Sequence, residues 1–171
     1  MNRPYNTSIF YKKISLIKQV IPDIAITTDI MVGFPNEDSN SFSKTINFVR
    51  KICFAKIHVF KYSNRKECLA ALLPNKVDNR VKKERSKRLQ DLSKELFYDF
   101  QKKFLNSIAD VLVEDEIKDQ EGRIYSRGIT DNYIKVMIPD FIGKKGKIVS
   151  VKLNQISSNY IVSTGIRDFI S

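Results

Sequence analysis

Few residues in this chain have the types and spacing that catalysis or metal binding requires. It has a single histidine, His58, which leaves no two-histidine metal site and no conventional catalytic triad. Its two cysteines, Cys53 and Cys68, match no metal-ligand spacing, so we expect reduced thiols in a cytoplasmic protein. Residues 33–37 hold too few glycines for a phosphate-binding loop. The residues alone therefore identify no catalytic or metal-binding constellation.

Asp29 is the one acidic side chain in the apolar run at residues 24–35. A near-continuous run of this kind is typical of a parallel strand that is covered on both faces. A carboxylate buried there would need a partner. That partner is either structural, such as a backbone N–H or an arginine, or a ligand, and both interpretations stay open.

The elements around Asp29 form an α/β pattern. The spacing of apolar residues predicts a helix at 8–20, a strand at 24–33, a helix with its apolar stripe at 42–52, and a strand at 57–63. Helices alternating with strands over short connections predict βαβ units and a parallel sheet. Two strands do not close such a sheet, so this part resembles a piece of a larger structure.

A long helical pattern follows the loop-like residues 64–79 and extends from residue 79 to about 106. Its first turns are crowded with cations, which oppose the helix dipole. They form either a solvated face or an RNA contact. Residues 1–105 carry 21 basic and 10 acidic side chains, whereas residues 106–171 carry 9 of each. The basic excess in the first part favours a polyanionic partner such as RNA, although a lysine-rich codon bias would produce it too.

From residue 108 the pattern changes to about five short alternating runs. They lie at 109–113, 122–126, 133–138, 147–152 and 160–163, and turn residues separate them. This pattern predicts a small antiparallel β-barrel of the oligonucleotide-binding type, with a domain boundary near residue 106. No segment is long and apolar enough to span a membrane.

Four segments resemble the radical-SAM methylthiotransferases, and most closely the branch that acts on threonylcarbamoyladenosine in tRNA. They are Met-Asn-Arg-Pro-Tyr at 1–5, the run ending in Val-Gly-Phe-Pro at 24–35, His-Val-Phe-Lys-Tyr-Ser-Asn-Arg at 58–65, and Thr-Asp-Asn-Tyr-Ile-Lys-Val at 130–136. The last of these is similar to that branch's TRAM domain, a β-barrel that binds tRNA. The resemblance covers nearly the whole chain in matching order.

The resemblance implies a three-part cytoplasmic enzyme that uses S-adenosylmethionine and two 4Fe-4S clusters. Residues 1–78 would be the C-terminal portion of its partial TIM barrel, 79–106 a linking basic helix, and 107–171 the TRAM domain. The CxxxCxxC cluster loop and the N-terminal domain have no counterpart here, and the two cysteines match none of the cluster ligands. We therefore expect no catalysis by the isolated chain, and a separate N-terminal half is a candidate partner beside tRNA.

The resemblance also suggests site residues. One wall of the S-adenosylmethionine pocket would come from the C-terminal strand ends, at Asp29, Val59, Phe60, Tyr62 and Ser63. Tyr133 is a candidate for base stacking, and basic side chains would contact phosphates. The candidate RNA-binding residues are Arg80, Lys82, Lys83, Arg85, Arg123, Arg127, Tyr133, Lys135, Lys144 and Lys145.

Two departures from the family pattern leave alternatives open. Asn-Glu-Asp stands at 36–38 where the family usually has Gly-Glu-Thr, and Lys-Glu-Cys-Leu-Ala at 66–70 replaces Pro-Gly-Thr-Pro-Ala. Such changes fit a divergent member or a gene under relaxed selection. The chain is thus a portion of an enzyme, a tRNA-binding module without chemistry, or an inactive remnant with an open sheet edge.

Overall fold

The computed structural model describes residues 4–65, 68–118, 121–143 and 145–167, and the chain divides into two compact units, Met1–Phe97 and Tyr98–Ser171. The first unit contains α1 (Thr7–Val20), β1 (Thr27–Val32), α2 (Ser39–Ile52), β2 (Lys56–Lys61), the short 3-10 helix η1 (Leu69–Leu72) and most of α3 (Asn79–Lys102). The division between the units falls inside α3. No helix in the described ranges has both the length and the apolar character of a membrane span.

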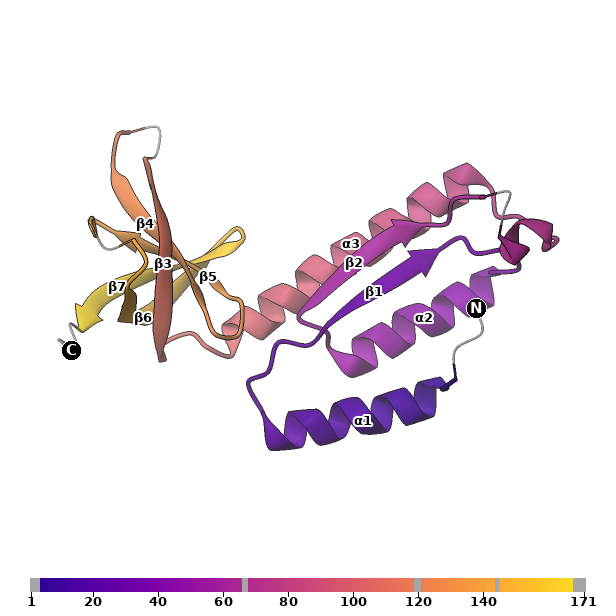
Figure 1. The fold of residues 1–171 in the computed structure, drawn as a ribbon, viewed down its shortest axis with the longest axis horizontal. Coiled ribbons are helices and arrows are strands. Elements are labelled where there is room, and N and C mark those ends of the chain that lie inside the picture. Colours follow the sequence, from indigo (N-terminus) through magenta and orange to yellow (C-terminus); the bar gives the residue numbers. More distant parts are fainter. Residues whose placement is uncertain (1–3, 66–67, 119–120, 144, 168–171) are drawn as a thin grey trace. The chain divides into compact units, whose positions relative to one another are not determined.

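The first unit confirms the predicted helix–strand order. Strands β1 and β2 run parallel and lie side by side (Figure 1), with Asp29 paired to His58 and Met31 paired to Phe60 in the register. Helix α2 connects them, as a βαβ unit requires. The sheet in this unit has two strands among the described residues.

The helix boundaries follow from capping chemistry. At the start of α2, the Asp38 carboxylate accepts the Ser41 backbone N–H at 2.7 Å, and at the start of α1 the Asn6 side chain accepts that of Ile9 at 3.0 Å. Helix α2 ends at Cys53, which adopts the left-handed conformation with φ 54°.

One apolar core holds the first unit together. The stripe of α2 at Phe42, Ile46, Val49 and Ile52 packs with Leu89, Leu92 and Leu96 of α3 and with the strands, and Phe10 and Ile14 of α1 pack against its margin. These residues recur every three or four positions, which places them on one face of each helix.

The prediction that β1 is covered on both faces is wrong. Burial alternates along the strand, so Thr27, Asp29 and Met31 are exposed while Val32 is buried. The helices cover one face of the sheet, and no described element covers the other. Asp29 therefore lies at the surface and has no need of the buried partner that the sequence pattern called for.

The second unit contains a closed five-stranded barrel. Its strands are β3 (Ile108–Lys118), β4 (Ile124–Thr130), β5 (Lys135–Pro139), β6 (Ile148–Ser157) and β7 (Tyr160–Arg167), in the order β3-β4-β5-β7-β6. Inward-facing side chains such as Val111, Val136, Leu153 and Ile161 are buried. The five predicted strands are all present, and most extend further than the sequence pattern indicated.

The barrel differs from the prediction in one pairing. Four of the five pairings between described strands are antiparallel, whereas β5 and β7 pair parallel through Val136–Ile161 and Met137–Val162. Closing a ring of five strands makes this necessary, because alternating directions cannot be kept around an odd number.

Candidate functional site

The uncovered face of the small sheet carries part of the predicted cofactor wall. Asp29 and Phe60 both lie on it, and Phe60 is 53% exposed. Val59 faces the other way and packs against the helix-covered core. The side chain of Val59 thus has a structural role here, while Asp29 and Phe60 remain available to a ligand or to another protein segment.

The loop that follows β1 is tied to the end of β2. The Tyr62 backbone N–H donates to the Val32 carbonyl at 2.8 Å, and the Phe34 and Tyr62 rings meet edge to face at 5.4 Å between centroids. Lys82 of α3 places its ammonium 5.4 Å from the centroid of the Tyr62 ring. Ser63 is exposed beside this assembly. The carboxyl ends of the two parallel strands therefore form one ordered edge, where such sheets bind ligands.

A buried ion pair fixes this strand-end loop. Glu37 accepts the Gly33 backbone N–H at 2.6 Å, and the Arg85 guanidinium donates to the Glu37 carboxylate at 3.0 Å and to its carbonyl at 2.8 Å. The side chains of Arg85 and Glu37 are only 9% and 14% exposed. Gly33 has φ 74°, and a Cβ there would clash with Lys82. The loop is thus held by charge, by backbone hydrogen bonding and by close packing.

These contacts divide the basic cluster of α3 into two groups. Arg85 is buried in its ion pair, and Lys82 is half-buried against Gly33 and Tyr62. Arg80 and Lys83 are exposed. The sequence pattern identified a cationic segment, but the tertiary packing determines which of its side chains face solvent. Because Arg85 is buried, it does not belong to an RNA-binding surface.

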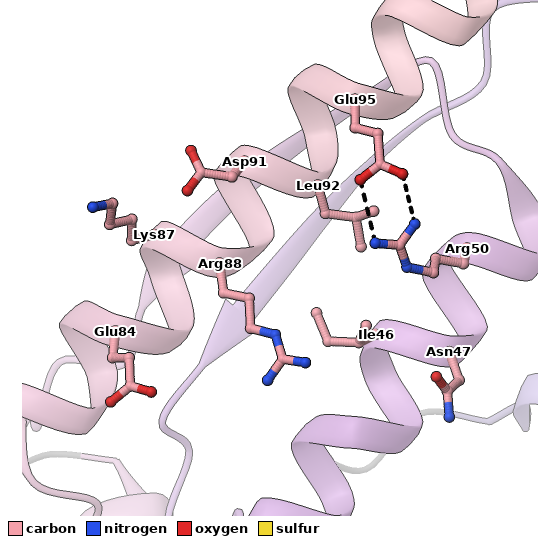
Figure 2. A pocket seen from close by; sticks show the side chains of 9 residues that line it. All are labelled: Ile46, Asn47, Arg50, Glu84, Lys87, Arg88, Asp91, Leu92 and Glu95. Carbon is pink, nitrogen blue, oxygen red and sulfur yellow. Dashed lines mark hydrogen bonds and ion pairs between the residues drawn. The ribbon is translucent and has the colours of Figure 1, made fainter.

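A groove of about 520 Å³ lies between α2 and α3. Figure 2 shows that Arg50 of α2 and Glu95 of α3 form an ion pair across it, 2.7 Å apart, while Arg88 extends between the two helices. The groove is lined by Ile46, Asn47, Arg50, Glu84, Lys87, Arg88, Asp91, Leu92 and Glu95. It includes none of the predicted cofactor residues, and its three cations are balanced by three carboxylates.

On the barrel, two predicted RNA-binding residues converge on Tyr160. The Arg127 guanidinium forms a two-pronged pair with the Asp115 carboxylate and reaches the Tyr160 hydroxyl at 3.5 Å. Lys135 lies over the Tyr160 ring, 5.7 Å from its centroid. Hydrogen bonding to Asp115, and secondarily to Tyr160, raises the pKa of Arg127, and the bond from Arg127 lowers the pKa of Asp115. Sequence analysis missed Tyr160 and Asp115, because only the barrel pairing brings these strands together.

The remaining predicted RNA-binding residues lie near strand connections. Arg123 pairs with Glu121 at 2.9 Å just before β4. Tyr133 is 72% exposed in the turn between β4 and β5, where it adopts φ 65°. Lys145 is exposed, and Lys144 lies outside the described residues.

The chain's own residues do not fit an iron–sulfur cluster. A cluster needs three or four thiolates at one site, and the chain has two cysteines, both exposed. Within the described ranges, no three histidine, cysteine or acidic side chains gather in a metal-binding arrangement. Cluster chemistry, where this chain takes part in it, must use ligands from elsewhere.

Known proteins resemble the chain along most of its length. It is 36% identical over 153 residues, 90% of the chain, to the threonylcarbamoyladenosine tRNA methylthiotransferase of Bacillus subtilis. It is 35% identical over 161 residues, 94% of the chain, to a tRNA-2-methylthio-N(6)-dimethylallyladenosine synthase of Caldicellulosiruptor saccharolyticus, and 32% identical over 158 residues, 92% of the chain, to that of Aquifex aeolicus. These relatives confirm the predicted resemblance to the radical-SAM methylthiotransferases, although no protein-family model matches the chain.

The segment shared with these methylthiotransferases is about a third of their length. The chain covers 34% of the Bacillus and Caldicellulosiruptor proteins and 35% of the Aquifex protein. Activity and substrates of the whole enzymes therefore do not pass directly to this chain.

The residues of the first departure from the methylthiotransferase pattern suit the conformation of the loop in this chain. Asn36 stands where the family usually has glycine and adopts φ 66°, a left-handed conformation that asparagine tolerates better than most residues. Asp38, in place of threonine, is an equally competent helix cap. Glu37, which the family pattern shares, keeps the ion pair to Arg85. In the second departure, Lys66 and Glu67 lie outside the described residues.

Proposed function

We propose that this chain is the C-terminal part of a radical-SAM tRNA methylthiotransferase that acts in the cytoplasm on N6-threonylcarbamoyladenosine beside the anticodon. In this proposal, residues 1–78 form the last part of the partial TIM barrel, and 79–106 the linking basic helix. Residues 107–171 form the TRAM domain, an OB-like barrel that holds tRNA. The observation that carries the proposal is the similarity to tRNA methylthiotransferases over nine-tenths of the chain.

The open face of the sheet supports a role within a larger barrel. Its exposed apolar side chains include Met31 at 40% and Phe60 at 53%, next to the ordered strand-end loop. Such a face is costly to leave in water. We propose that the N-terminal part of the enzyme, on the same or a separate polypeptide, covers this face. Asp29, Phe60, Tyr62 and Ser63 would then form one wall of the S-adenosylmethionine pocket.

When bound in that enzyme, S-adenosylmethionine and its cluster would supply the radical chemistry. This chain's part would be to orient the cofactor, because the strand-end loop is rigidly held by Glu37 and Arg85. The thiolates would come from the part that carries the CxxxCxxC loop.

Exposed cations support tRNA binding. In the proposed complex, Arg80, Lys83, Arg123, Lys135 and Lys145 contact phosphates, with Lys82 at the margin, and Tyr133 lies at the barrel turn.

The alternative role, a stand-alone tRNA-binding module without catalysis, is favoured by the two exposed cysteines that fit no cluster. An inactive remnant is the third possibility, and the strand-end loop, which Glu37 and Arg85 hold in place, argues against it.

Fluorescence anisotropy with labelled tRNA and the full chain tests the binding role. If these five phosphate contacts form, raising the salt from about 50 to about 200 mM should weaken binding roughly 100- to 500-fold. Arg80→Gln combined with Lys83→Gln should flatten this dependence, whereas Lys94→Gln, a change at an exposed lysine of the same helix, should leave it alone. Absence of tRNA binding at low salt by a folded chain would refute the binding role.

Catalysis requires a second experiment. The full chain should show no methylthiolation of tRNA when supplied with iron, sulfide and S-adenosylmethionine, because it lacks the thiolates for a cluster. Addition of a polypeptide that supplies the N-terminal part of a methylthiotransferase should restore activity if the chain is an enzyme portion. No restoration, together with retained tRNA binding, would favour the stand-alone module.

A further inference from the structure

The cluster around Tyr160 lies on an outward face of the barrel. Along β4, Ser126, Gly128 and Thr130 are buried and face inward, so the side chains of Arg127 and Ile129 between them point outward. Met137 of β5 pairs with Arg127 of β4 and with Val162 of β7. These half-buried side chains and Tyr160 form one surface over β4, β5 and β7, which we call the Tyr160 face.

The ring of Tyr160 is half-buried and held in place. Its hydroxyl is reached by Arg127, whose guanidinium is itself fixed by Asp115. The ammonium of Lys135, an exposed residue, lies over the ring. The long, exposed side chain of Lys135 can swing aside and uncover that face of the ring. A ring held in this way loses little conformational freedom when a planar group stacks on it.

The charge balance argues against phosphate as the main ligand of this face. Asp115 neutralises Arg127, which leaves Lys135 over the Tyr160 ring and Lys145 close to Asp115 as the remaining cations. Residues 106–171 as a whole carry 9 basic and 9 acidic side chains. A surface with an anchored aromatic ring and half-buried apolar neighbours suits the face of a base, while the lysines beside it suit the adjoining phosphates.

The position of the Tyr160 face within the barrel also favours nucleotide binding. Small five-stranded barrels of the oligonucleotide-binding type bind across their second and third strands and beside the loops that join strands 1–2 and 4–5. Here those strands are β4 and β5. Arg123 directly precedes β4, and Tyr160 directly follows the Ser158 turn between β6 and β7. Arg127 and Lys135 of these strands meet Tyr160 at this face.

We propose that Tyr160 is a stacking platform for one unpaired RNA base, with Arg127 and Asp115 as positioning residues that hold the ring. This inference rests on the proposed tRNA-binding role and adds to it the feature that the barrel recognises, a single-stranded nucleotide. Lys135 then moves from the ring to an adjacent phosphate. Tyr133, the aromatic residue that the sequence suggested, is not the principal platform.

The experiment measures binding of the full chain to a fluorescein-labelled single-stranded 12-nucleotide RNA and to the same RNA in a duplex. Tyr160→Ala should weaken single-strand binding about tenfold, and Tyr160→Phe, which keeps the ring, should weaken it much less. Tyr98→Ala, at a 49% exposed tyrosine of α3, is the matched control and should bind like the unmodified chain. Thermal melts of each variant establish that the barrel remains folded.

The salt dependence separates stacking from charge. Tyr160→Ala should leave the slope of log affinity against log salt unchanged, because no phosphate contact is removed. Asp115→Asn should steepen that slope by up to about one, because it exposes the charge of Arg127. These readouts would not respond to a merely structural role of the cluster.

Three results would overturn the inference. One is single-strand affinity unchanged in a folded Tyr160→Ala variant, and another is a larger loss in Tyr133→Ala than in Tyr160→Ala. The third is duplex binding as tight as single-strand binding. Each of these leaves the proposed tRNA-binding role standing if the unmodified chain still binds tRNA. Failure of the unmodified chain to bind any RNA would overturn both.

Discussion

Glu37→Gln is expected to destabilise the first unit strongly, because it breaks a buried ion pair while keeping the side chain's shape. The Glu37 and Arg85 side chains are 14% and 9% exposed, and the two groups are 3.0 Å apart. The substitution leaves the Arg85 charge buried without its counter-charge. Removing one partner of a buried pair typically costs about 3 to 5 kcal/mol.

The structure places the expected cost at the lower end of that range. Arg85 keeps its hydrogen bond to the Glu37 backbone carbonyl at 2.8 Å, and the glutamine oxygen can still accept the Gly33 N–H. The free energy of unfolding should therefore fall by about 3 kcal/mol. This is a large part of the roughly 5 to 15 kcal/mol that stabilises a typical domain.

Urea unfolding followed by the helical circular dichroism signal measures this effect. With a slope of roughly 1.5 kcal/mol per molar urea, the midpoint should fall by about 2 M. Glu95→Gln is the matched control, since it breaks another glutamate–arginine pair of the same unit in which both side chains are about half exposed. That midpoint should not move measurably, because exposed pairs contribute little.

Equal urea midpoints for the Glu37→Gln and Glu95→Gln variants would refute the reasoning, because burial would then not determine how much an ion pair contributes to stability. A double variant, Glu37→Gln with Arg85→Gln, adds a further check. If the loss in the single variant comes from an unpaired buried charge, removing that charge should restore part of the stability.

Three further predictions concern the backbone and its caps. Gly33→Ala should lower the free energy of unfolding by about 2 kcal/mol, because the alanine is strained in the left-handed conformation and its Cβ clashes with Lys82. Gly122→Ala, with φ 80° and no neighbour within 4 Å, should lower the free energy of unfolding of its own unit by about 1 kcal/mol, as measured by urea unfolding. Asn36→Gly should be tolerated or slightly stabilising in the same assay, because glycine adopts φ 66° without strain; a marked loss would show that the asparagine side chain is needed. Asp38→Ala should lower the melting temperature at neutral pH. Hydrogen bonding to Ser41 lowers the pKa of Asp38 from 3.8, so its stabilisation is present above that value and is lost as the pH falls through the lowered pKa; melting curves of the two proteins should converge in strong acid.

Local sequence features determined the elements of this protein. The apolar stripe at Phe42, Ile46 and Val49 and the cap at Asp38 were enough to locate α2, because a helix repeats every 3.6 residues and its first N–H groups need acceptors. The short alternating runs located the five barrel strands for a similar reason. The family, too, was recognisable from four short segments.

The tertiary structure alone decided what each side chain does. Arg85 and Arg80 belong to one cationic segment, yet one is buried in an ion pair and the other is exposed, because only packing against the strand-end loop distinguishes them. Asp29 is at the surface because no described element covers that face of the sheet. Tyr160 meets Arg127 across 33 positions of sequence because an odd-stranded barrel closes through the parallel pairing of β5 and β7. Contacts between distant strands depend on how the whole chain closes, and no local pattern encodes that.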